Sequence, residues 1–189
     1  DGDNDLAVVN RTGFNVSILT NNGSGSFSNS ASLTVGVFPE YLELGDIDGD
    51  VDVDIVTSNS NSSSVSVSKN NGSGTFAPQV QYTIGATPKG IELGDLDGDG
   101  DLDIVASRSP SGSNPDFVSL LLNDGTGTFA AATNQVTGND TRDVALGDFD
   151  GDGHLDVAAV NNEDDAVTNL RNLTGSYKLT LLASDRFNE

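Results

Sequence analysis

The run Asp95-Leu-Asp-Gly-Asp-Gly-Asp-Leu-Asp103 places a carboxylate at every second position of a nine-residue loop. Two close copies start at Asp46 and Asp148, so that successive loops begin 49 and 53 residues apart. A partial copy, Asp1-Gly-Asp-Asn-Asp5, opens the chain. A repeat of this length is typical of architectures built from one supersecondary unit per repeat. We therefore expect one such unit around each loop.

Short segments of alternating apolar residues flank every loop. Around the central loop they are Gly90–Gly94 before it and Ile104–Ala106 after it. A third segment contains Val118 and Leu120, and a Gly-rich turn that ends in Phe129 leads into the fourth. Alternation with a period of two, broken by Gly, Asn and Ser, predicts strands joined by tight turns and no helix.

Four strands in a repeat of about 50 residues predict an all-β fold, a β-propeller of four-stranded antiparallel blades. About four blades are present, in an incomplete or open circle. The predicted repeats of this single propeller segment are approximately 1–38, 39–87, 88–140 and 141–189. A parallel β-helix is the rival architecture, but its repeats are shorter and contain fewer strands.

The composition is strongly acidic. Of 189 residues, 29 are Asp or Glu and 8 are Lys or Arg, which gives a formal net charge of -21. This balance excludes nucleic acid, whose phosphates bind clustered Lys and Arg. No apolar run approaches the roughly 20 residues that span a bilayer, so we expect no membrane insertion. The chain has no Cys, which excludes a zinc–thiolate site. The recurring Asp residues are best explained by a bound cation.

Calcium prefers about six to eight oxygen ligands, and a tight loop of alternating Asp can direct several of them at one point. The first, third, fifth and ninth places are expected to bind through side chains, the ninth in a bidentate manner. The seventh place is expected to bind through its backbone carbonyl, with its side chain pointing outward. The expected ligands of about three Ca²⁺ ions are Asp46, Asp48, Asp50, Asp52, Asp54, Asp95, Asp97, Asp99, Asp101, Asp103, Asp148, Asp150, Asp152, His154 and Asp156. Among them Asp52, Asp101 and His154 occupy the seventh place.

The four loops are not expected to bind equally well. We place Asp1, Asp3 and Asp5 at the third, fifth and seventh places, which puts Ala7 at the ninth and predicts a weak or metal-free site. Val51 stands where the other full loops have Gly, and a β-branched residue is strained if that place needs a positive φ. The expected order of affinity is the loop at 95–103, then 148–156, then 46–54, then the partial loop.

Two other kinds of loop share part of this pattern. An EF-hand loop also begins Asp-x-Asp-x-Asp-Gly, but it needs a Glu at its twelfth place and flanking helices. An Asx-rich turn without metal is the second. It is disfavoured because converging carboxylates repel by roughly 3–4 kcal/mol per close pair in a partly screened site.

The run Gly147–Val157 and the turn Asn71–Phe76 resemble the FG-GAP/VCBS repeat family, which includes the blades of the integrin α-subunit propeller and many bacterial surface proteins. The resemblance extends over nearly the whole chain. It implies that each loop joins the first two strands of a blade and binds calcium on the underside of a propeller. Family propellers commonly have more blades than this chain supplies, so flanking chain or a partner subunit is expected to complete the circle.

The resemblance implies a non-catalytic, extracellular adhesion or ligand-binding module, secreted or on the cell surface, with a protein or carbohydrate ligand. Two alternatives stay open: the propeller portion of a polysaccharide-degrading enzyme such as a lyase, and a structural repeat of a surface filament. A glycosidase needs two carboxyls in differing environments, whereas these loops are nearly equivalent. We therefore predict no catalytic residue.

Two further kinds of residue have ordinary explanations. Phe27, Phe76, Phe129 and Tyr177 recur at one place in the repeat and are expected to form the core between blades rather than a ligand platform. His154 is the single histidine. A catalytic base would need a partner nucleophile, and the sequence indicates none. His154 is therefore expected to occupy an exposed loop position.

Overall fold

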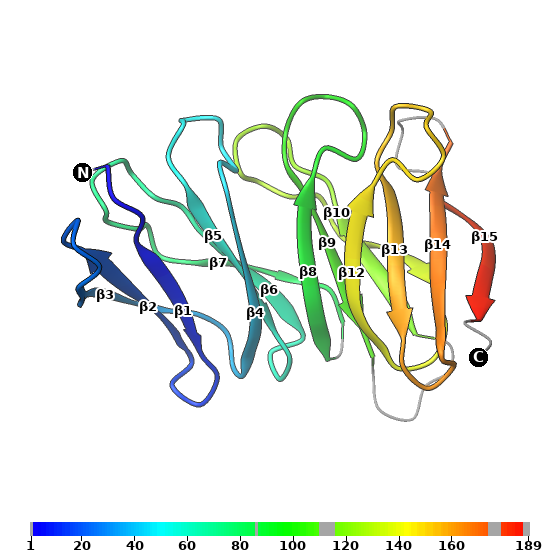
Figure 1. Ribbon diagram of the computed structural model, residues 1–189, viewed down its shortest axis with the longest axis horizontal. Coiled ribbons are helices and arrows are strands. Elements are labelled where there is room, and N and C mark those ends of the chain that lie inside the picture. The colour runs from blue at the N-terminus through cyan, green and yellow to red at the C-terminus, as the bar shows by residue number, and fades with distance from the viewer. Residues whose placement is uncertain (1, 86, 110–115, 174–178, 187–189) are drawn as a thin grey trace.

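The computed structural model describes residues 2–85, 87–109, 116–173 and 179–186. Within these ranges the chain forms strands and turns and no helix, and the strands make four antiparallel sheets. The all-β prediction is therefore confirmed. No helix with the length and apolar character of a bilayer span occurs in the described ranges. Figure 1 shows the sheets side by side, with the sheet of β1, β2 and β3 at one end of the row and β15 at the other.

Each sheet is a meander in which strands adjacent in sequence are paired. The first sheet has three strands and the others have four. The first contains β1 (Leu6–Asn10), β2 (Asn15–Asn21) and β3 (Phe27–Thr34). The second contains β4 (Pro39–Gly45), β5 (Asp54–Asn59), β6 (Ser64–Ser68) and β7 (Val80–Thr83). The third contains β8 (Pro88–Gly94), β9 (Asp103–Arg108), β10 (Phe117–Leu121) and β11 (Thr133–Val136). The fourth contains β12 (Thr141–Gly147), β13 (Asp156–Asn161), β14 (Ala166–Asn172) and β15 (Leu179–Arg186).

The core lies between the sheets. One cluster of buried residues, which includes Val16 and Ile55, joins the first sheet to the second. A larger cluster joins the second to the third, and a further cluster joins the third to the fourth. Every residue of β5 and β6 is buried, because sheets pack against both faces of the second sheet. Stacking of neighbouring repeats therefore supplies the hydrophobic stabilisation that one sheet alone lacks.

The Gly that precedes the Asp-rich loop allows adjacent sheets to approach closely. A Cβ atom on Gly94 would lie 2.7 Å from Leu146 Cδ1 in β12 and 2.8 Å from Leu155 Cδ1 in the loop between β12 and β13. A Cβ on Gly45 would meet Leu102 Cδ1 of the third sheet at 2.7 Å. The recurring Gly-Asp dipeptide thus combines a packing requirement with the start of the loop.

The aromatic residues at the recurring place differ in burial. Phe129 of the third sheet is buried and packs edge-on against Tyr82 of the second, with ring centroids 5.3 Å apart. Phe76 is partly buried against the cluster between the first two sheets. For these two residues the expected core position is confirmed. For Phe27 it is wrong: the ring is 44% exposed, because no sheet of the described structure packs against it. Tyr177 lies outside the described residues.

Candidate metal sites

The three complete Asp-rich loops occupy equivalent positions, each between the first and second strands of a sheet, as predicted. Residues 46–53 connect β4 to β5, residues 95–102 connect β8 to β9, and residues 148–155 connect β12 to β13. All three lie along the same edge of the row of sheets, at the top of the view in Figure 1. Repetition of the fold therefore gives a row of acidic loops on one side of the molecule.

The first Asp of each loop organises the backbone around its own carboxylate. Asp95 Oδ1 accepts the Gly98 N–H at 2.7 Å, and Oδ2 accepts the Gly100 N–H at 3.1 Å. In the fourth sheet the N–H groups of Gly153 and Gly151 donate to Asp148 and hold the pKa of its carboxyl below the ordinary value. These bonds are those of an Asx-type turn, so the loops are preformed by their own backbone.

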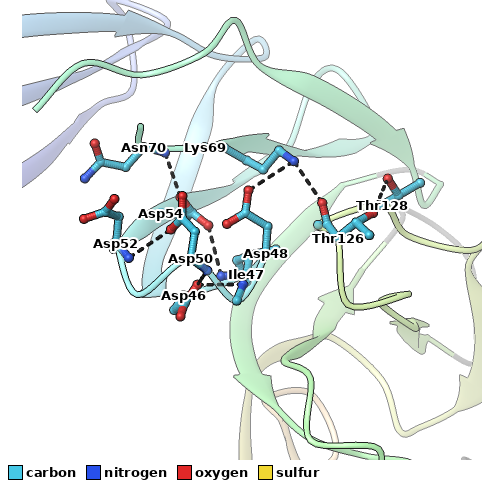
Figure 2. Close-up of polar contacts among 12 residues, drawn as sticks. Asp46, Ile47, Asp48, Asp50, Asp52, Asp54, Lys69, Asn70, Thr126 and Thr128 are labelled. Carbon is cyan, nitrogen blue, oxygen red and sulfur yellow. Dashed lines mark hydrogen bonds and ion pairs between the residues drawn. The ribbon is translucent and has the colours of Figure 1, made fainter. Parts of the chain in front are cut away.

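The loops bring carboxylate oxygens together as a cation site requires. In each loop three Asp residues offer oxygen atoms that all lie within 4.8 Å of one another. Figure 2 shows the arrangement in the second sheet. The three groups are Asp46, Asp48 and Asp50; Asp95, Asp97 and Asp99; and Asp148, Asp150 and Asp156. The first and third places thus converge in every complete loop, joined by the fifth place in two loops and the ninth in one.

Unpaired carboxylate oxygens distinguish these loops from simple Asx turns. Asp48 Oδ1 and Asp97 Oδ1, both at the third place, are buried and have no hydrogen-bond partner within the described structure. Burial raises the pKa of Asp97, and the nearby carboxylate of Asp99 raises it further. A buried oxygen without a partner is costly, whereas a divalent cation would satisfy it and neutralise its neighbours. The residues present therefore fit a hard cation with oxygen ligands.

The Asp at the ninth place joins two parts of the sheet. Asp103 is fully buried, its Oδ2 accepts the Leu96 N–H at 2.9 Å, and its Oδ1 accepts the Asn123 N–H at 2.8 Å. Burial raises the pKa of Asp103 to about 6, although the two amides act in the opposite direction. Asp54 and Asp156 make the same pair of contacts. Sequence reasoning proposed these residues as bidentate metal ligands and did not find this backbone-tying role.

The partial loop needs a correction of register. Asn21 N–H donates to Asp5 Oδ1 at 2.8 Å, the contact that Asn123 makes with Asp103. Leu6 pairs with Leu19 in the first sheet as Ile104 pairs with Leu121 in the third. Asp5 therefore stands at the ninth place and Asp3 at the seventh, and assigning the ninth place to Ala7 was wrong by two residues. Asp1, which this register puts at the fifth place, lies outside the described residues.

The seventh-place side chains lie against the Gly-rich turn of their own sheet. Asp52 Oδ2 would lie 2.5 Å from a Cβ on Gly72, and Asp101 Oδ2 is equally near a Cβ on Gly125. Figure 2 shows the Asp52 carboxylate directed away from the Asp46 and Asp48 carboxylates. Any ligand that this residue gives to the cluster would therefore come from its backbone.

His154, at the seventh place of the last loop, is half-buried rather than exposed. Its backbone N–H donates to Asp152 Oδ1 at 2.9 Å, as the N–H of Asp101 donates to Asp99 Oδ1. The loop therefore keeps the same backbone turn with a different side chain at this place.

Val51 has the positive φ that the glycines of the other loops indicated. Its φ is 78°, compared with 95° at Gly100 and 90° at Gly153. Its side chain is 86% exposed and so gains little from packing. We expect Val51→Gly to stabilise the chain by about 1 kcal/mol, because the left-handed conformation costs an L-residue roughly that amount. Urea unfolding of both forms would measure the difference.

The matched control for this substitution is Gly100→Val, at the same place in the third sheet. A Cβ on Gly100 would meet no atom within 4 Å, so only backbone strain is introduced. It should destabilise the chain by a similar amount. Equal unfolding free energies for Val51→Gly and the unaltered protein would contradict the assignment of strain to this position.

Two of the three complete loops are also held by the sheet that follows them. Asn123 Nδ2 donates to the Ile47 carbonyl at 2.7 Å, across the junction between the second and third sheets. Asn172 Nδ2 donates in the same way to the Leu96 carbonyl, across the junction between the third and fourth. The side chains of Ile47 and Leu96 are buried in these junctions, whereas the equivalent Phe149 is 56% exposed. Loop shape therefore depends on contacts between sheets as well as within them.

A cavity of about 170 Å³ lies between the first and second sheets, on the side of the acidic loops. Leu6, Ile18, Ile55 and Phe76 are among the apolar residues that line it, with Asn70 at its wall. Asn70 occupies the place that Asn123 and Asn172 have in the following sheets. None of the Asp residues of the three acidic clusters lines this cavity, although Asp5 of the partial loop does.

A row of antiparallel sheets, each with an acidic loop between its first two strands, defines a repeat domain of the β-propeller type. The model of the FG-GAP-like repeat matches residues 1–57, 46–106 and 107–159, and the chain belongs to this family. No curated protein matches its sequence.

The fold is also similar to part of a solved structure, that of the Photorhabdus luminescens Tc holotoxin pore. The TM-score is 0.50 at 17% sequence identity, over 88% of this chain and 9% of the other. This likeness concerns the fold alone, because this chain spans less than a tenth of the length of that protein.

Proposed function

We propose that the chain is a non-catalytic, calcium-binding segment of a β-propeller that acts in adhesion or ligand binding outside the cell. The observation that carries the proposal is the recurrence of one acidic loop in three consecutive sheets. In each of these loops three carboxylates converge on one point. Family membership supports the same conclusion. The chain belongs to the FG-GAP-like repeats, and resemblance to this family implies that the acidic loops bind calcium.

Calcium is the cation that this chemistry favours. The clusters offer oxygen ligands only, and the chain contains no Cys to attract a softer metal. Magnesium demands near-ideal octahedral geometry and retains its waters, whereas calcium accepts irregular sets of carboxylate and carbonyl oxygens. About three ions would be held by the loops at 46–54, 95–103 and 148–156.

The edge opposite the acidic loops is the proposed ligand side. Phe14 and Phe38 lie there, in turns next to β1 and β4, with ring centroids 5.3 Å apart in an edge-to-face pair. The Arg11 guanidinium lies 4.9 Å from the Phe38 centroid and pairs with Glu40 at 3.1 Å. Aromatic rings beside charged donors and acceptors suit a carbohydrate or an extracellular protein loop. Bound calcium would stiffen the other edge, and flanking chain or a partner subunit would complete the propeller.

Calorimetric titration with calcium tests the proposal. We expect about three ions to bind, with dissociation constants of about 0.1–1 mM, the range of extracellular modules. Magnesium at the same concentrations should release much less heat. A glycan array should then find binding that Phe14→Ala weakens, and incubation with acidic polysaccharides should release no unsaturated sugars. Absence of calcium binding at 10 mM would overturn the metal assignment, and release of unsaturated sugars would favour a lyase instead.

A further inference from the structure

A basic side chain pairs with the third-place carboxylate of the acidic loop in the second sheet. Lys69 Nζ lies 3.2 Å from Asp48 Oδ2 and donates to the Thr126 carbonyl at 2.9 Å (Figure 2). Thr126 belongs to the Gly-rich turn of the third sheet. The ammonium is therefore held from both sides, by a proposed calcium ligand and by the neighbouring sheet.

The fourth sheet repeats this arrangement with a different residue. Arg171 Nη1 lies 3.0 Å from Asp150 Oδ2, and Asp150 is again the third-place carboxylate. The two basic residues occupy the same place in the repeat, since each directly precedes the Asn whose N–H binds the ninth-place Asp. The same contact thus occurs in two sheets. A long basic side chain at this place of the repeat can therefore reach the third-place carboxylate of its own loop.

The third sheet lacks the basic residue. Leu122 stands directly before Asn123, at the place of Lys69 and Arg171, and its half-buried side chain carries no charge. Asp97 therefore has no basic partner at this place, and its Oδ1 is buried without a hydrogen-bond partner in the described structure. The three loops therefore also differ at a place that lies outside the loops themselves, occupied by Lys69, Leu122 and Arg171.

We propose that Lys69 and Arg171 are tethered cations that compete with calcium for the third-place carboxylates, whereas Leu122 leaves the loop at 95–103 without a competitor. This inference rests on the proposed calcium binding and adds the rule that orders the sites. An ammonium or guanidinium about 3 Å from a ligand oxygen repels an incoming divalent ion, and it also occupies a lone pair that the ion needs. The loop at 95–103 consequently fills first, and the other two need higher calcium concentrations.

The tethered cation has a second effect when calcium is absent. It neutralises Asp48 and, through the Thr126 carbonyl, links the second sheet to the third. Side-chain exposure of 35% for Lys69 and 18% for Asp48 shows that this pair is partly withdrawn from water. Lys69 thus stabilises the calcium-free form while it weakens calcium binding, so the two effects of removing it have opposite signs.

Calcium titration followed by NMR can separate the sites. The Gly49 N–H donates to Asp46 and the Gly98 N–H donates to Asp95, so each amide signal reports on its own loop. We expect Lys69→Leu to tighten binding reported by Gly49 by about tenfold and to leave Gly98 unchanged. Leu122→Lys should weaken binding reported by Gly98 by a similar factor. Arg142→Leu removes the same charge at the start of β12, the end of that strand away from its acidic loop, and should change neither.

A melting curve in chelator supplies the second readout. Lys69→Leu should lower the melting temperature without calcium, although it strengthens calcium binding. A purely structural role would instead weaken both, and unchanged dissociation constants in Lys69→Leu and Leu122→Lys would also overturn the inference. If the Gly98 amide signal of the unaltered protein does not shift with calcium, the proposed calcium binding itself is wrong, whatever the two variants show. The two failures are therefore distinguishable.

Discussion

Removal of calcium with a chelator is expected to lower the melting temperature of the chain by about 8–16 °C. At a calcium concentration ten times the dissociation constant, each occupied site adds roughly 1.4 kcal/mol to the stability of the folded state. Three loops would together contribute about 4 kcal/mol. In a domain of this size a change of 1 kcal/mol shifts the melting temperature by about 2–4 °C. Without the ions, the converging carboxylates at the first, third and fifth places repel one another and favour opening of the loops.

Differential scanning calorimetry at fixed ionic strength, with and without chelator, measures this shift. Adding excess magnesium in place of calcium is the control for general screening of the formal net charge of -21. The shift should be largely retained in Asp5→Ala, whose loop is incomplete, and reduced in Asp99→Ala. Equal melting in both buffers would contradict stabilisation by calcium, and strongest calcium occupancy in the partial loop would show that the order of the sites is wrong.

Asp103→Ala is expected to cost about 4 kcal/mol of unfolding free energy even with calcium removed. The substitution leaves the backbone N–H groups of Leu96 and Asn123 without their acceptor, in a position that excludes water. Each buried donor without a partner costs about 1–3 kcal/mol. Asp5→Ala should cost only about 1 kcal/mol, because the contact of Asp5 with the Asn21 N–H is exposed to solvent.

Urea unfolding in chelator separates this structural role from metal binding. Asp99→Ala is the matched control, because the exposed Asp99 belongs to the same acidic cluster but ties no second strand to the loop. It should lower stability by less than about 1 kcal/mol in chelator and act mainly on calcium affinity. If Asp103→Ala and Asp5→Ala prove equally destabilising without calcium, the ninth-place Asp has no special part in joining the loop to the sheet.

Strand positions and loop placement were predictable because their signals are local. Alternating apolar residues such as those of Gly90–Gly94 and Ile104–Ala106 lie in β8 and β9, and the Asp-rich run lies between them. The positive φ of Val51 was also predictable, since two aligned glycines indicated the backbone that this place requires. Repetition made these inferences strong, because three aligned copies supported the strands and loops and two aligned glycines supported the φ of Val51.

The register of the partial loop was not predictable from alternation alone. With Asp at every second position, shifting the alignment by two residues superposes Asp on Asp and leaves the pattern almost unchanged. The pairing of Leu6 with Leu19 and the contact of Asn21 with Asp5 resolve the ambiguity, and both depend on strands that are distant in sequence. The apolar residue directly after Asp5 was the signal that could have found the correct register.

The contacts of Lys69 and Arg171 with the acidic loops were also not predicted from the sequence. Lys69 and Arg171 lie far along the chain from Asp48 and Asp150, and only antiparallel pairing brings each side chain to its loop. The Asn that follows each of them was a visible landmark, since it recurs as Asn70, Asn123 and Asn172. Aligning on that Asn would have revealed two basic residues and one Leu at a single place. Phe27 was misplaced for a different reason, because burial of a repeated residue requires a neighbouring sheet as well as the right position.

The bond from Asn123 to the Ile47 carbonyl, with its counterpart from Asn172 to Leu96, has a consequence for how such arrays evolve. The acidic loops at 46–53 and 95–102 are each shaped partly by a residue encoded one repeat later. A duplication, deletion or exchange of a repeat therefore alters the ion site of the repeat that precedes it, even when that repeat keeps every carboxylate. Selection on the proposed calcium affinity would consequently act on pairs of adjacent repeats, and a repeat transplanted alone would not carry its affinity with it.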